Sequence, residues 1–334
     1  MIRASIPFDV VRYAVLGGPA PGNRAYPLGA LGNEELSQMS KRDALGVTVS
    51  LQRKGTCSLT EAHGRYVPNI VAARPRANRR SWDISHLLID SQDDPRCENV
   101  LTVLFREVSQ RKGERVFLRL RADDPLVGIV AHCGFTKYGD ETLFVGSRKA
   151  FTGNPPQFVS RMKQADQHDV FRLYNASTPT RTRLALGMTL DQWRASLEVA
   201  GWMNREYVYR QDDVVRGWIQ TTQRGRSGIL TLMNHPDADS CVAALVQHGM
   251  SRMWGANTVY CLVQDHQVRL DSLLRQHDFD EAGQYVTMMR SIASPMTIKE
   301  PSRAVRLAGV GPTVDLSERW QRAKMEELVD TRSS

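Results

Sequence analysis

The hydrophobic and polar positions of this chain follow the same order of elements twice. In the first half, the pattern predicts a strand, an amphipathic helix, a second strand and a short helix over residues 84–90, 98–111, 115–120 and 125–133. In the second half, it predicts the same four elements over residues 228–233, 239–254, 258–263 and 267–277. Strands and helices have side-chain periods of 2 and about 3.6 residues, and each segment fits its assigned period.

Three matched pairs of residues set the offset at 143 or 144 positions: Val71 with Val214, Val116 with Val259, and Phe135 with Phe279. Chance similarity does not hold one spacing across four elements, and a period of this length is domain-sized, which favours duplication over a solenoid. We predict domains over residues 1–151 and 158–293, joined by the Gly- and Pro-containing segment 152–157. A tail over residues 294–334 would carry a helix from Asp315 to Val329.

The remaining segments complete the two predicted domains. Residues 17–33 are rich in Gly and Pro, which indicates an irregular loop. Strands are predicted at Val47–Leu51, Tyr66–Arg74, Trp82–Asp90, Glu206–Arg210, Val214–Thr221 and Tyr285–Arg290. Helices are predicted at Asp169–Asn175 and at Thr189–Val199, where Thr189 and Gln192 have the spacing of a capping box. The predicted fold class is therefore α/β (α+β), with a mixed, mostly antiparallel sheet flanked by helices in each domain.

The composition places the chain among globular proteins. Its 334 residues exceed what one hydrophobic core normally fills, and 41% apolar with 24% charged residues argues against extensive disorder. No apolar run approaches the roughly 18 residues that cross a bilayer, so we expect no membrane span and a cytoplasmic location. The five cysteines are odd in number and lack CxxC spacing, which predicts buried free thiols and no metal site.

A formal charge of +8 raises the question of an anionic partner. The densest basic run, Arg74, Arg76, Arg79 and Arg80, is interpreted as a solvated hairpin turn. Nucleic-acid binding is disfavoured because the sequence shows neither a groove-reading helix nor an aromatic stacking motif. The basic charge could equally serve a phosphorylated cofactor.

The order of elements in both halves resembles the GCN5-related N-acetyltransferase (GNAT) superfamily. The pairs Gly134-Phe135 and Asp278-Phe279 stand where that family has a Gly-Phe before its closing strand. The resemblance implies two tandem GNAT-like domains. It also implies that acetyl-CoA binds where the fourth and fifth strands separate, with its pyrophosphate at the start of the following helix, whose free N–H groups attract phosphate.

In the family, this phosphate-binding turn has Gln or Arg at its first position, Gly at its fourth and Gly or Ala at its sixth. Neither half keeps that pattern. The first half also places the carboxylates of Asp93, Asp94 and Glu98 where a pyrophosphate would bind, so the cofactor is expected in the second half. By the resemblance, the cofactor-binding residues there are Leu232, Met233, Asn234, Asp239, Ser240, Cys241, Ala243 and Ala244.

Acyl transfer needs a base for the substrate ammonium and an acid for the departing thiolate. The tyrosine that the family often uses as the acid is replaced by Val130 and Leu274. The residues that could take over catalytic roles are His235, Tyr260 and Tyr285. Each of them also has a purely structural interpretation.

Two hypotheses follow from this reading of the sequence. The first is an acyl-CoA-dependent N-acyltransferase that transfers an acetyl group to an unidentified amine, with the cofactor in the C-terminal half. The alternative is a catalytically inactive tandem GNAT-fold module that binds a ligand or a partner. The sequence leaves open whether the chain forms a homodimer.

Overall fold

A computed structural model describes residues 2–16, 22–31, 41–53, 55–61, 69–89, 95–151, 158–198 and 204–292. Residues Met1–Pro295 form one compact unit, to which the following description applies. The predicted linker 152–157 and the predicted tail helix lie outside the described residues. The predicted domain boundary therefore stays a prediction.

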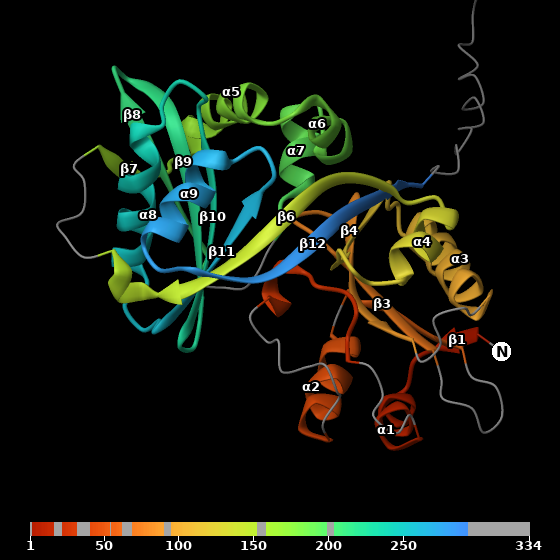
Figure 1. Ribbon diagram of the computed structural model, residues 1–334. Helices are drawn as coiled ribbons and strands as arrows, with labels where there is room; N and C mark the ends of the chain where they lie inside the picture. The colour runs from red at the N-terminus through yellow and green to blue at the C-terminus, as the bar shows by residue number, and fades with distance from the viewer. Residues whose placement is uncertain are drawn as a thin grey trace, which may run out of the picture. The chain divides into compact units, whose positions relative to one another are not determined.

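Twelve strands of the described residues form a single sheet in the order β1-β2-β3-β4-β5-β12-β6-β11-β10-β9-β8-β7 (Figure 1). They are β1 (Ile2–Ala4), β2 (Cys57–Glu61), β3 (Asn69–Pro75), β4 (Ser81–Leu88), β5 (Arg115–Arg121), β6 (Thr136–Ser147), β7 (Val159–Arg161), β8 (Asn204–Gln211), β9 (Val214–Arg224), β10 (Ser227–Asn234), β11 (Thr258–Gln264) and β12 (Asp280–Ser291). The pairs β4–β5 and β10–β11 are parallel, and their neighbours are antiparallel. The predicted mixed, mostly antiparallel sheet is confirmed.

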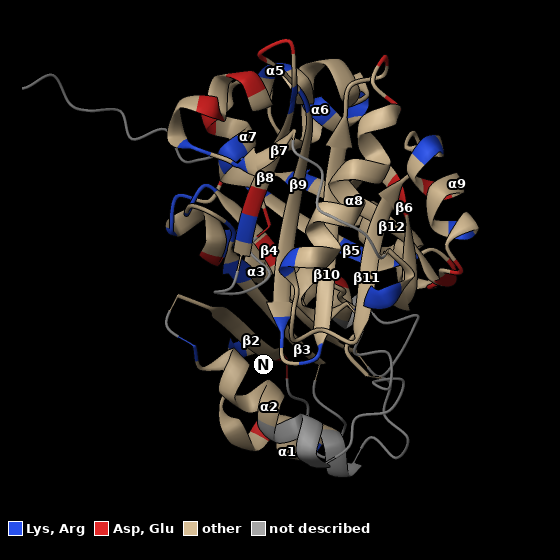
Figure 2. Cartoon of the chain, turned by 90° about the vertical axis from the view of Figure 1, so that its left-hand side faces the viewer, with Lys and Arg blue, Asp and Glu red and all other residues tan. Residues whose placement is uncertain are grey.

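The helices cover both faces of the sheet. They are α1 (Pro7–Leu16), α2 (Lys41–Leu51), α3 (Pro95–Gln110), α4 (Leu126–His132), α5 (Gln167–Ser177), α6 (Thr180–Leu186), α7 (Leu190–Ser196), α8 (Ser240–Arg252) and α9 (Val268–Gln276). Neighbouring residues of a strand point to opposite faces. Phe144 of β6 packs in the cluster built from α8 and α9, whereas Leu143 packs with Leu28 of the N-terminal segment. In Figure 2, α8 runs across β9 and β10.

The two halves each contribute one long strand to the centre of the sheet. β6 follows α4 of the first half but pairs with β11 of the second, and β12 follows α9 but pairs with β5 of the first. β6 and β12 also pair with each other, and in Figure 1 they run side by side between the two halves. Sheet hydrogen bonds therefore cross the predicted boundary between the halves.

The register of these strands supports the duplication. Val116 pairs with Arg290, and Val259 pairs with Gly146. The two pairs are equivalent, since Val116 and Val259 are 143 positions apart and Gly146 and Arg290 are 144 apart.

The turns before the closing strands match in the same way. Gly134 and Asp278 both have positive φ, at 84° and 57°. The next residues, Phe135 and Phe279, are buried, and each donates its N–H to a carbonyl of the preceding helix at 3.1 Å.

One predicted strand is wrong. Residues Val47–Leu51 belong to helix α2. Their Val-Thr-Val run favours a strand by propensity, but Val47 and Leu51 lie one helical turn apart and pack together against Val10 and Tyr13. Tertiary packing decides the conformation here. Among the elements not predicted are α1, α6 and β2.

Candidate active site

The sheet opens at two equivalent places. β4 and β5 pair only from Ser81 to Asp83, opposite Arg115 to Phe117, and then separate. β10 and β11 pair from Ser227 to Leu230, opposite Thr258 to Cys261, and then separate. We call these the first and the second opening. Beyond each one, backbone groups of the two strands need other partners.

The chain itself fills the first opening. Residues Asn23–Tyr26, from the Gly- and Pro-rich N-terminal loop, lie between β4 and β5. Arg24 donates its backbone N–H to Leu87 O at 3.1 Å, and Tyr26 donates its backbone N–H to Arg119 O at 3.0 Å. The segment thus supplies backbone donors to both separated strands.

Side chains fix this segment in place. The Asn23 amide donates to Ser85 O at 2.9 Å and accepts from Leu87 N at 2.8 Å. Arg24 forms an ion pair with Asp124, which also accepts from Leu126 N at the start of α4. Ala25 is buried in the core beneath the opening. We name residues Asn23–Tyr26 the plug.

A single side chain bridges the second opening. Gln267, just before α9, donates its Nε2 to Leu232 O of β10 at 2.6 Å. Its Oε1 accepts from Gln264 N of β11 at 2.9 Å. The amide therefore joins the two strands where they separate.

A cavity of about 110 Å³ adjoins the second opening, on the sheet face that carries α5, α6 and α7. Its lining is mostly apolar and includes Tyr174, Trp193, Trp218, Leu232, Met233 and Leu262. Polar groups enter it from both halves of the chain: Arg76, Arg119, Glu141, Glu198, Gln264 and Gln267. We call it the central cavity. A concave apolar site with a few convergent polar groups is typical of ligand binding.

Five buried charges meet beside this cavity. Arg119 donates from Nε to Glu141 at 2.6 Å and from Nη2 to Glu198 at 2.6 Å. Arg76 pairs with Asp83 at 2.7 Å and with Glu198 at 3.5 Å, and its guanidinium lies 3.8 Å from the centroid of the Phe117 ring. Three carboxylates therefore share two guanidinium groups.

The pKa values of these carboxylates diverge. Burial raises the pKa of Glu198, but Arg119 and Arg76 more than offset this effect and hold it at about 2. Burial raises the pKa of Glu141 above its usual value, against the opposing effect of Arg119. Burial likewise raises the pKa of Asp83, against Arg76. Glu198 is thus the firmly ionised member, and Glu141 is a cavity-lining carboxylate with increased proton affinity.

Comparisons with known proteins bear on this arrangement. No family model matches the sequence, and no curated protein matches it. The structure is similar to that of a GCN5-related N-acetyltransferase from Sphaerobacter thermophilus, with 13% sequence identity and a TM-score of 0.51. That match covers 87% of this chain and 95% of the other. The chain has the GNAT fold.

Two further structures are similar at lower scores. A putative acetyltransferase from Pyrococcus horikoshii has a TM-score of 0.48 and 13% identity, over 87% of this chain and 89% of its own. A tandem GNAT protein from the clavulanic acid biosynthesis pathway has a TM-score of 0.47 and 10% identity, over 88% of this chain and 98% of its own.

The predicted cofactor residues lie along the second opening. Leu232 and Met233 line the central cavity. Asp239, Ser240 and Ala243 are exposed at the start of α8. Cys241 is buried, with its sulfur 3.7 Å from Arg216 O, and burial raises its pKa to about 12. Asn234 donates to His235 O, and Ala244 packs on the core beneath α8.

The first turn of α8 uses some of its donors internally. Cys241 N and Val242 N donate to Ala238 O and Asp239 O at 3.1 and 3.2 Å. The exposed carboxylate of Asp237 lies three residues before this helix. This helix start is thus less prepared for a phosphate than the family's glycine-containing turn.

The three predicted catalytic residues do not line the central cavity. His235 directly follows β10, and its Nδ1 accepts from Asp237 N at 3.2 Å. Tyr260 packs in the cluster around Leu28, and Tyr285 lies edge-on to Tyr26 at 5.1 Å. Tyr285 is nevertheless the cross-strand neighbour of Glu141. Their catalytic roles stay predictions.

Sequence reasoning missed the buried charges. Arg76 was expected to be solvated, but its side chain is 4% exposed, because it turns in from the β3–β4 hairpin onto Asp83. A usable signal was present, since Arg119 interrupts the apolar run of β5 between Leu118 and Leu120. A charged residue on the inner face of such a strand requires a buried partner.

The described residues contain neither a membrane-spanning helix nor a cluster of metal ligands. The helices placed there include none with the length and apolarity to cross a membrane. No group of three or more His, Cys, Asp or Glu residues within the described ranges is arranged to hold a metal ion. Four of the free cysteines are buried, and Cys133 is half-buried.

Proposed function

We propose that this chain is an acyl-CoA-dependent N-acyltransferase whose second opening receives the acyl donor and whose central cavity receives the amine. One observation carries the proposal: β10 and β11 separate onto a cavity that already contains a buried carboxylate, Glu141. The first opening cannot serve in the same way while the plug occupies it.

The second opening fits an acyl-CoA in part. Residues 240, 243 and 244 at the start of α8 have small side chains, which leaves the backbone there accessible. Entry between β10 and β11 requires Gln267 to release Leu232 O and Gln264 N, after which both strand groups are available to a ligand. Acetyl-CoA, when bound, would supply the acyl group as a thioester.

The residues of the cavity then provide the proton chemistry. Glu141 would take the proton from the substrate ammonium, and burial, which raises its pKa, increases its affinity for that proton. Arg119 orients the Glu141 carboxylate through the 2.6 Å hydrogen bond from Nε. The amine nitrogen would then form a bond to the acyl carbon as the carbon–sulfur bond breaks, and the departing CoA thiolate would take up the second proton that the nitrogen loses.

The size and the lining of the central cavity indicate what kind of group the substrate amine carries. An engineered cavity of about 150 Å³ in another protein accommodates benzene, so about 110 Å³ suits a compact apolar group. Tyr174, Trp193 and Trp218 supply aromatic surface, which also favours a neighbouring cation.

A second candidate function is a non-catalytic binding module. The Gln267 bridge and the internally bonded first turn of α8 favour it, because both use groups that a cofactor would need. In that case the central cavity would bind its ligand without chemistry.

The two candidates separate in an activity assay. The purified chain would be incubated with acetyl-CoA and a panel of small aryl and alkyl amines, and release of free thiol would be followed. Glu141→Gln should lower the rate by about 100-fold or more, the usual effect of losing a general base. Asp140→Asn is the matched control, since Asp140 is adjacent on β6 and half-exposed in a pair with Lys137.

Three outcomes of that assay are decisive. Turnover that Glu141→Gln abolishes and Asp140→Asn retains supports the transferase. Equal loss in both variants would contradict the role of Glu141. Binding of an amine without any turnover would support the binding module.

A further inference from the structure

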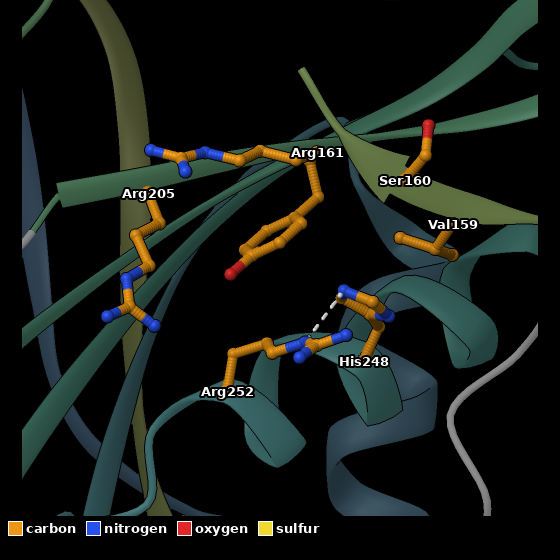
Figure 3. A pocket seen from close by; sticks show the side chains of 7 residues that line it. Val159, Ser160, Arg161, Arg205, His248 and Arg252 are labelled. Atoms are coloured by element: carbon orange, nitrogen blue, oxygen red, sulfur yellow. Dashed lines mark hydrogen bonds between the residues drawn. The ribbon is translucent and has the colours of Figure 1, made fainter.

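A larger pocket lies on the other face of the sheet, away from the central cavity. Its volume is about 490 Å³, and it is lined by Val159, Ser160, Arg161, Arg205, Tyr207, His248 and Arg252 (Figure 3). Tyr207 and Val159 also belong to the core cluster beneath α8, which places the pocket on the α8 face. We call it the basic pocket.

The local structure explains why these residues meet. Arg205 and Tyr207 are two positions apart on β8 and therefore point to the same face. Arg161 of β7 is the direct cross-strand partner of Tyr207. His248 and Arg252 are one turn apart on α8, so they share one side of that helix. In Figure 3 the side chains of Arg161, Arg205 and Arg252 surround the pocket.

The three arginines of the pocket contrast with the two buried arginines beside the central cavity. Within the described residues, no carboxylate lies within 4.0 Å of the guanidinium of Arg161, Arg205 or Arg252, whereas Arg76 and Arg119 each contact two. The nearby acidic residue of β8, Glu206, points to the opposite face and accepts from Trp218 Nε1 at 3.2 Å. The pocket therefore concentrates positive charge without an internal counter-charge.

His248 orients one of these cations. Its Nε2 lies 3.4 Å from Arg252 Nε, the contact drawn as a dashed line in Figure 3, and its ring lies edge-on to Tyr207 at 4.6 Å. Burial and the charge of Arg252 lower the pKa of His248 to about 4. At neutral pH the ring is therefore an uncharged acceptor that holds the Arg252 guanidinium at the pocket.

We propose that the basic pocket binds the phosphoryl groups of a small phosphorylated molecule. Guanidinium groups recognise phosphate oxygens with paired hydrogen bonds, and three of them can neutralise a polyanion. The volume lies in the usual range for small-molecule sites. Tyr207 adds a hydroxyl group that can donate to the same oxygens.

This site is separate from the place proposed for acyl-CoA. The pyrophosphate of that cofactor would lie at the first turn of α8, near Ser240. Arg252 is the last residue of the same helix. Twelve residues at 1.5 Å each separate these ends by roughly 18 Å.

The test uses the full chain and inorganic pyrophosphate as the probe, measured by titration calorimetry at a fixed, moderate salt concentration. We expect one site, and we expect the double variant Arg205→Gln/Arg252→Gln to weaken binding at least tenfold. Arg269→Gln is the control, because Arg269 is an exposed arginine of α9 outside the pocket. It should leave the affinity unchanged. Thermal unfolding of each variant checks that the fold is retained.

Three results would overturn the proposal. The first is no binding at millimolar pyrophosphate. The second is undiminished binding in the double variant, which would place the anion elsewhere, for example at α8. The third is tighter binding of duplex DNA than of pyrophosphate, with a steep salt dependence and the same loss in the double variant, which would assign the arginines to a nucleic acid.

Discussion

The two openings of the sheet have the same origin in the fold but are occupied in different ways. The plug fills the first opening with main chain, which bonds to both separated strands and is held by Asn23 and Arg24. At the second opening, the amide of Gln267 bridges the two strands. A long side chain can rotate away in nanoseconds, whereas removing the plug requires many contacts to break together. The same opening is therefore filled by main chain in one half and bridged by a side chain in the other.

Glu198 connects these two regions, and its loss should have the largest effect on stability. Its carboxylate accepts from Leu28 N, just after the plug, and pairs with both Arg119 and Arg76. Glu198→Ala leaves two buried guanidiniums short of counter-charge, which should lower the free energy of unfolding by about 3–5 kcal/mol. Urea unfolding measures this. Glu114→Ala, an exposed partner of Arg80, should cost no more than about 1 kcal/mol.

The Glu198 carboxylate should also make the free energy of unfolding depend on pH. The pKa of Glu198 is about 2 in the folded chain and 4.5 ordinarily, so its ionised form stabilises the fold above pH 4.5. That contribution is lost as the pH falls from 4.5 toward 2. The stability advantage of the native chain over Glu198→Gln should therefore shrink across this interval, as followed by urea unfolding at several pH values. An advantage that stays constant would contradict the assignment.

Loss of the hydrogen bonds that hold the plug in the first opening should have the next largest effect on stability. Asn23→Ala removes the partners of Leu87 N and Ser85 O within the opening, and the unmade hydrogen bonds should cost about 1–3 kcal/mol in unfolding free energy. Asn78→Ala is a suitable control because Asn78 caps an exposed turn through Arg80 N. If Asn23→Ala instead created a second acetyl-CoA site, the plug would be a removable lid and the first opening a working cleft.

Loss of the Gln267 bridge at the second opening should have the smallest effect of these changes. Gln267→Ala removes two hydrogen bonds that must break before a ligand enters the second opening. Two such bonds contribute roughly 1–2 kcal/mol, so acetyl-CoA affinity should rise about tenfold in calorimetry. An unchanged affinity would mean that the cofactor does not pass through this opening. Gln276→Ala, an exposed residue of α9, serves as the control.

The duplication and most strands and helices around the two openings could be predicted from the sequence, because periodicity and the repeated Gly-Phe and Asp-Phe turns are local signals. The plug could not. Its partners, Leu87 and Arg119, lie far along the chain, and irregular main chain has no periodic pattern. The helix at Val47–Leu51 was missed because β-branched propensity is overridden by packing on α1.

The candidate site was predicted only in part. The resemblance implies that Leu232 and Met233 bind the cofactor, and both line the cavity, but that role stays a prediction. The charges around the cavity come from β5, β6, the β3–β4 hairpin and the segment after α7. No local spacing brings Arg119, Glu141 and Glu198 together. Their convergence depends on the exchange of β6 and β12 between the halves.

We propose that acyl-CoA binds at the second opening and not at the first. The most direct test is calorimetric titration of the full chain with acetyl-CoA, repeated with Ala243→Glu at the exposed start of α8. We expect one binding site per chain. The carboxylate added by Ala243→Glu should lower the affinity for acetyl-CoA at least tenfold, and Gln276→Glu on α9 should leave it unchanged. Two sites per chain, equal affinity in the Ala243→Glu variant, or no binding at millimolar acetyl-CoA would contradict it.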